Sequence, residues 1–243
     1  MDNIILIMAG GLGKRMNSYL PKVLHLLKDK PLIVHVIESA LQLNPIKIGI
    51  IVGKYKEIIE KTINQYIFDN SMIEYIIQLE PLGTGHAIMS SIKFLSNYQN
   101  SIVTILSGDV PLIKSDTLKV LHNSVIEKDA AILVNTMDDP YGYGRIITDK
   151  NKFIKIVEEK DCNDDERKIN LVNSGIYTFK CNIILNNINK ITNNNNQNEY
   201  YLTDIFNFID KNVIDLVYLK NKYEIMGVNT YEQLVLLQTI NSF

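Results

Sequence analysis

The chain has 243 residues, of which 46% are hydrophobic and 21% charged. This is ordinary globular composition, long enough for one large domain with a sizeable core. A net charge of −2 lacks the basic footprint of nucleic-acid-binding proteins. The sequence also lacks a stretch of membrane-spanning length and the cationic flank of a signal peptide, so we expect a cytoplasmic protein without nucleic-acid or membrane partners. Cys162 and Cys181 have no metal-type spacing. They resemble free thiols of a reducing compartment, with a disulfide as the alternative.

Strand-like and helix-like runs alternate over the first half of the chain. We expect strands at 4–9, 46–52, 73–78, 101–106 and 130–136. We expect helices over 32–41 after Pro31, over 55–68 and over 84–95, and a further helix capped by Ser115. This alternation predicts a Rossmann-like α/β fold, with a mixed, mostly parallel sheet and helices on both faces.

The second half is richer in strands. Runs at 145–148, 153–158 and 173–179 predict a small antiparallel lobe over the mouth of the sheet. A short helix at 183–188, a mobile polar loop at 193–198, a helix at 201–210 and a strand at 213–219 follow. Leu234, Leu237 and Ile240 mark a last helix. Without a linker or an internal repeat, the pattern indicates one domain with an inserted lobe.

A glycine-rich loop, G-G-L-G-K-R-M at 10–16, follows the first predicted strand. Glycines allow a tight turn and a close approach to a ligand, and Lys14 and Arg15 add cations that suit phosphate. The loop lacks the Ser or Thr that a P-loop needs after Gly-Lys, and the third glycine of a dinucleotide fingerprint. The alternative is a simple glycine turn with solvated cations.

Further polar residues follow other strands, at the edge where open α/β sheets bind ligands. Asp109 could hold Mg²⁺, or could make a local turn bond. Gln78 carries an amide that suits a uracil edge, near Gly83 and Thr84, although Thr84 could simply cap a helix. Lys22 after Pro21 is a surface lysine unless the loop folds back over the ligand.

The lobe and the C-terminal region offer weaker signals. The segment G-Y-G-R at 142–145, which contains Gly144, could be a flexible turn or a point of ligand approach. Glu158 and Asn173 on neighbouring predicted strands could face a sugar or solvent. Asn229 precedes a predicted capping box of Thr230 and Gln233, which favours a helix-terminus role on this evidence alone. His86 is assigned no chemistry.

Together these segments resemble the pyrophosphorylase half of bacterial N-acetylglucosamine-1-phosphate uridyltransferases over nearly the whole chain. Each is short, but their joint order and spacing are specific. They are A-G-G-L-G-K-R-M (9–16), L-P-K-V-L-H (20–25), L-G-T-G-H-A (82–87), G-D-V-P-L-I (108–113), D-D-P-Y-G-Y-G-R-I (138–146), I-V-E-E-K-D (156–161), E-Y-Y-L-T-D-I (199–205) and G-V-N (227–229). The chain departs from the family at Gly10, Pro81 and Ser107, and it shows no hexapeptide repeats of an acetyltransferase β-helix. Since that β-helix makes the bacterial enzyme a trimer, the oligomeric state stays open.

The resemblance implies a role for each matching residue. Arg15 and Lys22 would be the catalytic cations that grip the triphosphate, and Asp109 and Asn229 would hold the Mg²⁺ cofactor. The remaining positions would bind substrate: Gly11, Gln78, Gly83 and Thr84 the nucleotide, and Gly144, Glu158, Asn173, Tyr201 and Thr203 the amino sugar.

The resemblance also implies the reaction UTP + N-acetylglucosamine-1-phosphate → UDP-N-acetylglucosamine + pyrophosphate. The single domain, 1–243, would then comprise a nucleotide-binding half at 1–136, a sugar-binding lobe at 137–228 and a C-terminal helix at 229–243. The alternatives are another sugar-1-phosphate nucleotidylyltransferase, which would use glucose-1-phosphate or dTTP, and a sugar-nucleotide sensor without turnover.

Overall fold

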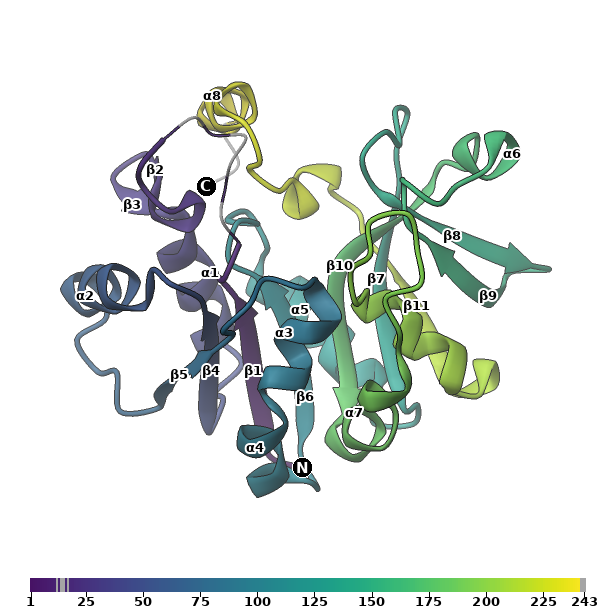
Figure 1. Ribbon diagram of the computed structural model, residues 1–243, viewed down its shortest axis with the longest axis horizontal. Helices are drawn as coiled ribbons and strands as arrows, with labels where there is room; N and C mark the ends of the chain where they lie inside the picture. The colour runs from purple at the N-terminus through teal and green to yellow at the C-terminus, as the bar shows by residue number, and fades with distance from the viewer. Residues whose placement is uncertain (12, 14–15, 17, 241–243) are drawn as a thin grey trace.

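The computed structural model describes residues 1–11, 13, 16 and 18–240. Within these residues, the main sheet has nine strands, seven of them in the order β11-β7-β10-β6-β1-β4-β5 (Figure 1). The seven are β1 (Asn3–Met8), β4 (Lys47–Val52), β5 (Ile73–Ile77), β6 (Ile102–Ser107), β7 (Ala130–Thr136), β10 (Leu171–Lys180) and β11 (Ile214–Tyr218). The other two, β8 (Gly144–Asp149) and β9 (Lys152–Val157), extend the sheet as a hairpin, and β2 (Leu26–Leu27) pairs with β3 (Lys30–Pro31) separately.

The centre of the parallel region is β1. It pairs in parallel with β4 on one side and β6 on the other, so that Ile5 faces Ile48 and Thr104. All four residues from Ile4 to Ile7 are fully buried. A continuous apolar run is what a strand covered on both faces requires, and the predicted strand at 4–9 is confirmed.

Helices cover both faces of the sheet, as the alternating pattern predicted. The first face carries α1 (Leu32–Leu41), α2 (Lys56–Tyr66) and α5 (Ser115–Ser124). The opposite face carries α3 (Thr84–Ser90), α4 (Ile92–Leu95), α7 (Cys181–Asn187) and the 3-10 helix η5 (Leu202–Phe208). The remaining helices are short or peripheral: η2 (Lys22–Leu24), η3 (Ser96–Tyr98), α6 (Asp164–Arg167), η4 (Ile188–Lys190), η6 (Lys211–Val213), η7 (Lys222–Ile225) and α8 (Tyr231–Thr239).

Several predicted boundaries are wrong in detail. The helix expected over 84–95 is divided at Ser91 into α3 and α4, and the helix expected at 201–210 is the 3-10 helix η5. Ser115 is the first residue of α5 and not its cap, a position that Lys114 takes in extended conformation. Local patterns locate such elements but leave their ends uncertain by a few residues.

The position of β10 corrects the prediction for the lobe. We expected an antiparallel extension, and β8 and β9 form one, but β10 lies inside the main sheet, antiparallel to both β6 and β7 (Figure 1). Its residues are buried almost throughout, as a central strand requires. The hairpin then joins the first part of β10, where Val172 pairs with Arg145.

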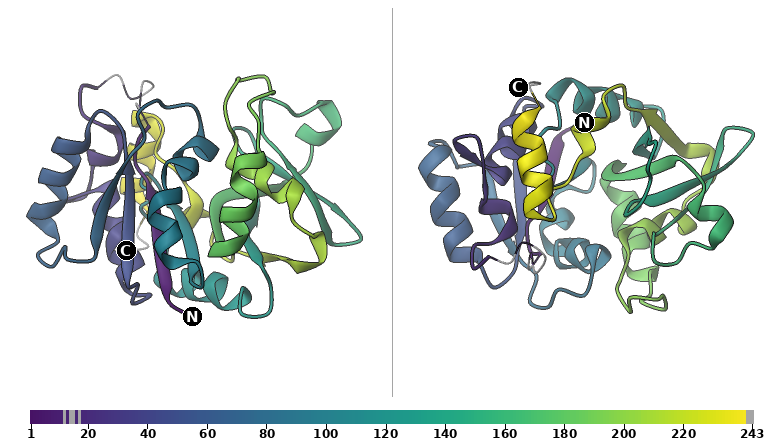
Figure 2. Two further views of the ribbon diagram at one scale, coloured as in Figure 1. Left: turned by 60° about the horizontal axis from the view of Figure 1, so that its bottom comes forward. Right: turned by 90° about the horizontal axis from the view of Figure 1, so that it is seen from above.

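Two connecting segments bring distant parts of the chain together. The polar loop at 193–198, which we expected to be mobile, is tied to the lobe because Asn196 hydrogen-bonds to the Asp161 carboxylate at 3.0 Å and to the Lys160 carbonyl at 2.8 Å. Helix α8 begins with the predicted capping box of Thr230 and Gln233, and it lies above the carboxyl ends of the parallel strands (Figures 1 and 2).

Among the helices of the described residues, none combines the length and the apolar sequence that a membrane span needs.

Candidate active site

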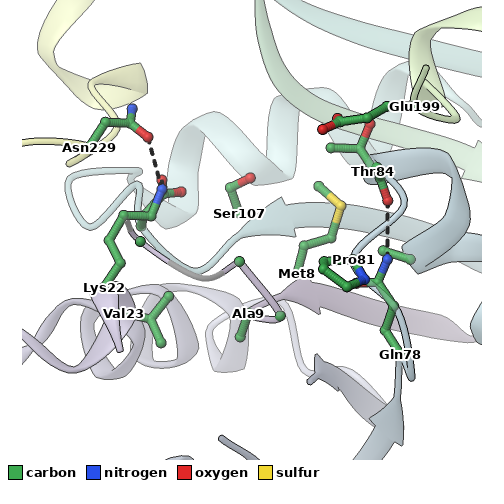
Figure 3. Close-up of a pocket in the computed structure, with 16 residues that line it drawn as sticks. Met8, Ala9, Lys22, Val23, Gln78, Pro81, Thr84, Ser107, Glu199 and Asn229 are labelled. Carbon is green, nitrogen blue, oxygen red and sulfur yellow. Dashed lines mark hydrogen bonds and ion pairs between the residues drawn. The ribbon is translucent and has the colours of Figure 1, made fainter. Parts of the chain in front are cut away.

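A cavity of about 520 Å³ opens at the carboxyl ends of β1, β5 and β6 (Figure 3). Parallel strands direct their carboxyl ends to the same edge, which is where open α/β sheets bind ligands. The structure brings together here seven of the predicted site residues: Gly11, Lys22, Gln78, Gly83, Thr84, Asp109 and Asn229. Arg15, the other predicted catalytic cation, lies outside the described residues, as does Lys14.

The glycines of the first loop are required by close approaches. Gly13 has a φ of +61°, and a Cβ there would come within 2.9 Å of the Lys22 Cβ atom. A Cβ at Gly10 would come within 2.9 Å of the Gln78 side-chain oxygen. Side chains at these positions would therefore displace the residues that line the cavity.

A cluster of charged and amide groups lies at one end of the cavity. The Lys22 ammonium forms an ion pair with Asp109 and donates a hydrogen bond to the Asn229 side-chain oxygen at 2.9 Å. The Val228 N–H donates to the Asp109 carbonyl at 2.9 Å, and the Asn229 N–H donates to Gln233 at 2.7 Å, so the backbone holds the two oxygen-bearing residues together. A carboxylate and an amide oxygen that converge on one cation form a donor set that suits Mg²⁺, with its other ligands from phosphate and water.

At the other end, Gln78 is oriented by its neighbours. Its side-chain nitrogen lies 3.2 Å from the Gly83 carbonyl and 3.2 Å from the His86 Nδ1 atom. Gly83 has a φ of +112° and precedes α3. The Thr84 hydroxyl does not cap this helix but accepts a hydrogen bond from the Leu202 N–H at 3.0 Å. His86, to which we assigned no chemistry, thus positions the side-chain amide of Gln78, the residue that follows β5.

A second cluster, the lobe cluster, contains Gly144, Glu158, Asn173 and Thr203. The Thr203 hydroxyl donates to the Glu158 carboxylate at 2.8 Å. A Cβ at Gly144 would lie 3.3 Å from a Glu158 oxygen and 3.5 Å from the Asn173 Cβ atom. Asn173 donates from its amide to the Tyr177 hydroxyl at 2.7 Å. Four of the five predicted sugar-binding residues therefore meet at one place, outside the lining of the 520 Å³ cavity.

Burial is the main influence on the acidity of this cluster. It raises the pKa of Glu158, against the hydrogen bond from Thr203, and the carboxylate of Asp204 raises the pKa further. Tyr201, the fifth predicted residue, accepts a hydrogen bond from Gln197 at 3.0 Å. Burial raises the pKa of its hydroxyl as well, with the charge of Glu158 among the smaller causes. Tyr201 therefore borders the lobe cluster.

One strap, Glu199 to Thr203, connects the cavity with the lobe cluster. The Tyr200 N–H donates to the Leu82 carbonyl at 2.8 Å, and the Gly85 N–H donates to the Tyr200 carbonyl at 2.7 Å. Glu199 lines the cavity, whereas Thr203 belongs to the lobe cluster. We did not assign Glu199, although it stands in the motif E-Y-Y-L-T-D-I that the sequence analysis quoted.

The fold and the cavity place the chain among the α/β proteins that have a ligand site at the carboxyl ends of parallel strands. The family described as Nucleotidyl transferase matches residues 4–223, and the chain belongs to this family.

The curated relatives agree with the resemblance that the motifs indicated. A "Probable UDP-N-acetylglucosamine pyrophosphorylase" of Acanthamoeba polyphaga mimivirus is 44% identical over 98% of this chain and 95% of its own length. Proteins named "Bifunctional protein GlmU" from Thermosipho melanesiensis and Clostridium beijerinckii are 43% and 41% identical over 96% of this chain. The chain spans 49% and 51% of these two relatives, about half their length.

Solved structures share the fold. A UDP-glucose pyrophosphorylase complexed with UDP-glucose superimposes with a TM-score of 0.78 at 20% identity, covering 98% of this chain and 97% of the other. A glucose-1-phosphate thymidylyltransferase described as putative, from Bacillus anthracis, gives a TM-score of 0.73 at 20% identity, covering 98% of this chain and 96% of the other. The predicted fold class is confirmed.

Proposed function

We propose that the chain transfers the uridylyl group of UTP to N-acetylglucosamine-1-phosphate, with release of pyrophosphate. The observation that carries this proposal is the pair of sites on one sheet: a cation position between Asp109 and Asn229 in the nucleotide-sized cavity, and the lobe cluster beyond the strap. The 44% identical relative named as a probable UDP-N-acetylglucosamine pyrophosphorylase supports the choice of substrates.

The chemistry needs no general base. A phosphate monoester is largely deprotonated at neutral pH, because its second pKa is about 6. An oxygen of the sugar phosphate forms the new bond to the α-phosphorus of UTP in line, while the bond from that phosphorus to the pyrophosphate oxygen breaks. The residues need only to hold two repelling anions together and to stabilise the charge on the leaving group.

Each part of the site has a role in this reaction. Lys22 on η2 faces the phosphate end of the cavity, and Arg15, assigned from its motif, would add a second cation there. Mg²⁺ held by Asp109 and Asn229 would supply Lewis-acid stabilisation of the phosphate charge. Gln78 would present its amide to the uracil edge, with Gly83 and Thr84 beside it, and Gly11 would contact the nucleotide through its backbone.

The lobe cluster suits a polyhydroxylated sugar. Glu158 can accept hydrogen bonds from sugar hydroxyls, Asn173 can both donate and accept, and Gly144 leaves room for close approach. Tyr201 and Thr203 complete this side. The assignment divides the single domain into a nucleotide-binding half at 1–136, a sugar-binding lobe at 137–228 and a C-terminal helix at 229–243. A cytoplasmic location suits the free, buried thiols of Cys162 and Cys181.

The proposal is tested by pyrophosphate release from a panel of nucleotides and sugar phosphates, with and without Mg²⁺. UTP with N-acetylglucosamine-1-phosphate should give the highest kcat/KM. Asp109→Ala should abolish Mg²⁺-dependent turnover, whereas Asp116→Ala on the surface of α5 should leave it unchanged. Preference for glucose-1-phosphate or dTTP would reassign the substrates. Tight binding of UDP-N-acetylglucosamine without pyrophosphate release from any pair would instead indicate a sensor.

A further inference from the structure

Three groups from distant parts of the chain meet at one end of the cavity, where Figure 3 shows Lys22 beside Asn229. Lys22 comes from η2, Asp109 follows β6, and Asn229 precedes α8. The Lys22 ammonium lies between the other two, paired with the Asp109 carboxylate and 2.9 Å from the Asn229 side-chain oxygen. The side chains of Lys22 and Asp109 are only 16% and 14% exposed. A positive charge therefore already occupies the point where the two oxygens converge.

Hydrogen bonds of the backbone fix the segments that carry Asp109 and Asn229. The Val228 N–H donates to the Asp109 carbonyl at 2.9 Å, which fixes the segment before Asn229 against the end of β6. Gly227 lies beside both residues, since a Cβ there would be 3.6 Å from the Asn229 amide nitrogen and from an Asp109 carboxylate oxygen, an ordinary contact distance. Lys22 reaches the same point through a flexible four-carbon side chain. If one of the three groups moves, it is the ammonium.

We propose that the Lys22 ammonium and a divalent cation are alternative occupants of the position between Asp109 and Asn229. The inference rests on the proposed nucleotidyl transfer and adds a coupling within its site. Mg²⁺ binds oxygen ligands at about 2.0–2.1 Å, and an ammonium in contact with the same two oxygens would be a like charge at close range. Cation binding thus requires Lys22 to move away from both oxygens.

The exchange links cation binding to nucleotide binding. Without a nucleotide, the displaced Lys22 ammonium loses its carboxylate partner and stays close to a divalent cation, which is unfavourable. Phosphate oxygens of the nucleotide offer the displaced ammonium a charge-assisted hydrogen bond. The nucleotide therefore makes cation binding easier, and by reciprocity the cation makes nucleotide binding easier.

The test measures Mn²⁺ binding alone, without nucleotide or turnover, by electron paramagnetic resonance of free Mn²⁺. Lys22→Met removes the competing charge and keeps an unbranched side chain only one atom shorter. This variant should bind Mn²⁺ at least about tenfold more tightly than the wild-type chain. Lys22→Arg keeps the charge and should stay as weak as wild type. Lys30→Met, which removes a lysine from the exposed Lys30–Glu38 ion pair, is the matched control and should change nothing. The gain should vanish in Lys22→Met/Asp109→Asn.

A second measurement uses the wild-type chain and does not depend on any variant. Acetic anhydride labelling followed by mass spectrometry should show the Lys22 amine becoming more reactive when Mn²⁺ is added, while Lys30 keeps its reactivity. The proposal is overturned if wild type binds Mn²⁺ as tightly as Lys22→Met or more tightly, or if neither binds it. It is also overturned if Mn²⁺ leaves the labelling of Lys22 unchanged. Failure of pyrophosphate release from every substrate pair would overturn the proposed function but would leave this comparison valid.

Discussion

Glu158 lies in the lobe cluster with its carboxylate bonded to Thr203 and partly withdrawn from solvent. Burial raises the pKa of this carboxyl group above its ordinary value of 4.5. The folded chain therefore holds the proton more tightly than the unfolded chain does. The stability contributed by Glu158 is fully present below the unfolded pKa and is lost as the pH rises through the folded pKa.

Glu158→Gln removes this dependence. We expect the variant to melt at a higher temperature than wild type at pH 8, because no buried charge forms, and the difference to shrink as the pH falls toward 4.5. Turnover should fall at every pH, since the amide accepts fewer hydrogen bonds from a sugar. Thermal denaturation from pH 4.5 to 8 measures the first effect and pyrophosphate release the second.

Glu166→Gln is the control with the opposite sign. Hydrogen bonds from the Asn163 backbone and from Lys155 lower the pKa of Glu166, so its stabilisation is present above the unfolded pKa and is lost as the pH falls. This variant should be less stable than wild type at pH 8. A melting-temperature difference for Glu158→Gln that is the same at every pH would show that burial does not control its ionisation.

At the scale of elements, the strap at Glu199–Thr203 depends on a glycine inside α3. A Cβ at Gly85 would lie 2.3 Å from the Ile191 side chain and 2.9 Å from the Tyr200 carbonyl. Helix propensity favours alanine over glycine by about 1 kcal/mol. Here the steric conflict opposes that preference, because the strap packs directly on the helix backbone.

Gly85→Ala should therefore destabilise the chain in spite of the gain in helix propensity. We expect a lower melting temperature and at least about a tenfold loss in kcat/KM, because the strap must move away from the cavity and from the lobe cluster together. Ser90→Ala at the end of the same helix is the control, and its activity should match wild type. An unchanged or raised melting temperature for Gly85→Ala would mean that the strap yields without cost.

The strands and their order show what local sequence patterns could and could not predict. Apolar runs located β1, β4, β5, β6 and β7 within a residue or two. The run is continuous in β1, β4 and β6, because these parallel strands are buried on both faces. The place of β10 between β6 and β7 was not predictable, since strand order depends on pairing between distant segments. The lobe contacts of Gln197, Tyr201 and Asn196 likewise depend on the tertiary fold, and the composition of that loop indicated only a polar segment.

Within the site, the structure brings together residues that were assigned from motifs, and their roles stay predictions. Lys22, Asp109 and Asn229 were assigned by resemblance and do lie together, although more than 100 residues separate the last two. His86 and Tyr177 were missed because they act on Gln78 and Asn173 rather than on a ligand, and a histidine or a tyrosine in a strand or helix has no distinguishing local pattern.

At the scale of the whole molecule, the antiparallel direction of β10 brings the two clusters to one edge of the sheet. Tyr177 of β10 pairs with Ile105 of β6, and the two strands are antiparallel. The beginning of β10, where Asn173 lies, is therefore at the same edge of the sheet as the end of β6, which Asp109 follows. A parallel strand at this place would carry its polar residues to the opposite edge. Under the proposed function, the cavity would bind the nucleotide end of the sugar nucleotide and the lobe cluster its sugar end.

This arrangement predicts how ligands stabilise the fold. At the same free concentration, a ligand that binds the folded state more tightly raises the melting temperature more. UDP-N-acetylglucosamine should raise the melting temperature of wild type more than UDP does, because its sugar adds contacts in the lobe cluster. In Thr203→Val, which removes the hydroxyl bonded to Glu158, the shift with UDP should be unchanged and the extra shift from the sugar should fall. Differential scanning fluorimetry in Mg²⁺ at matched ligand concentrations measures both. If Thr203→Val lost the UDP shift and the sugar increment in equal proportion, the two clusters would not be separate subsites for the two ends of the ligand.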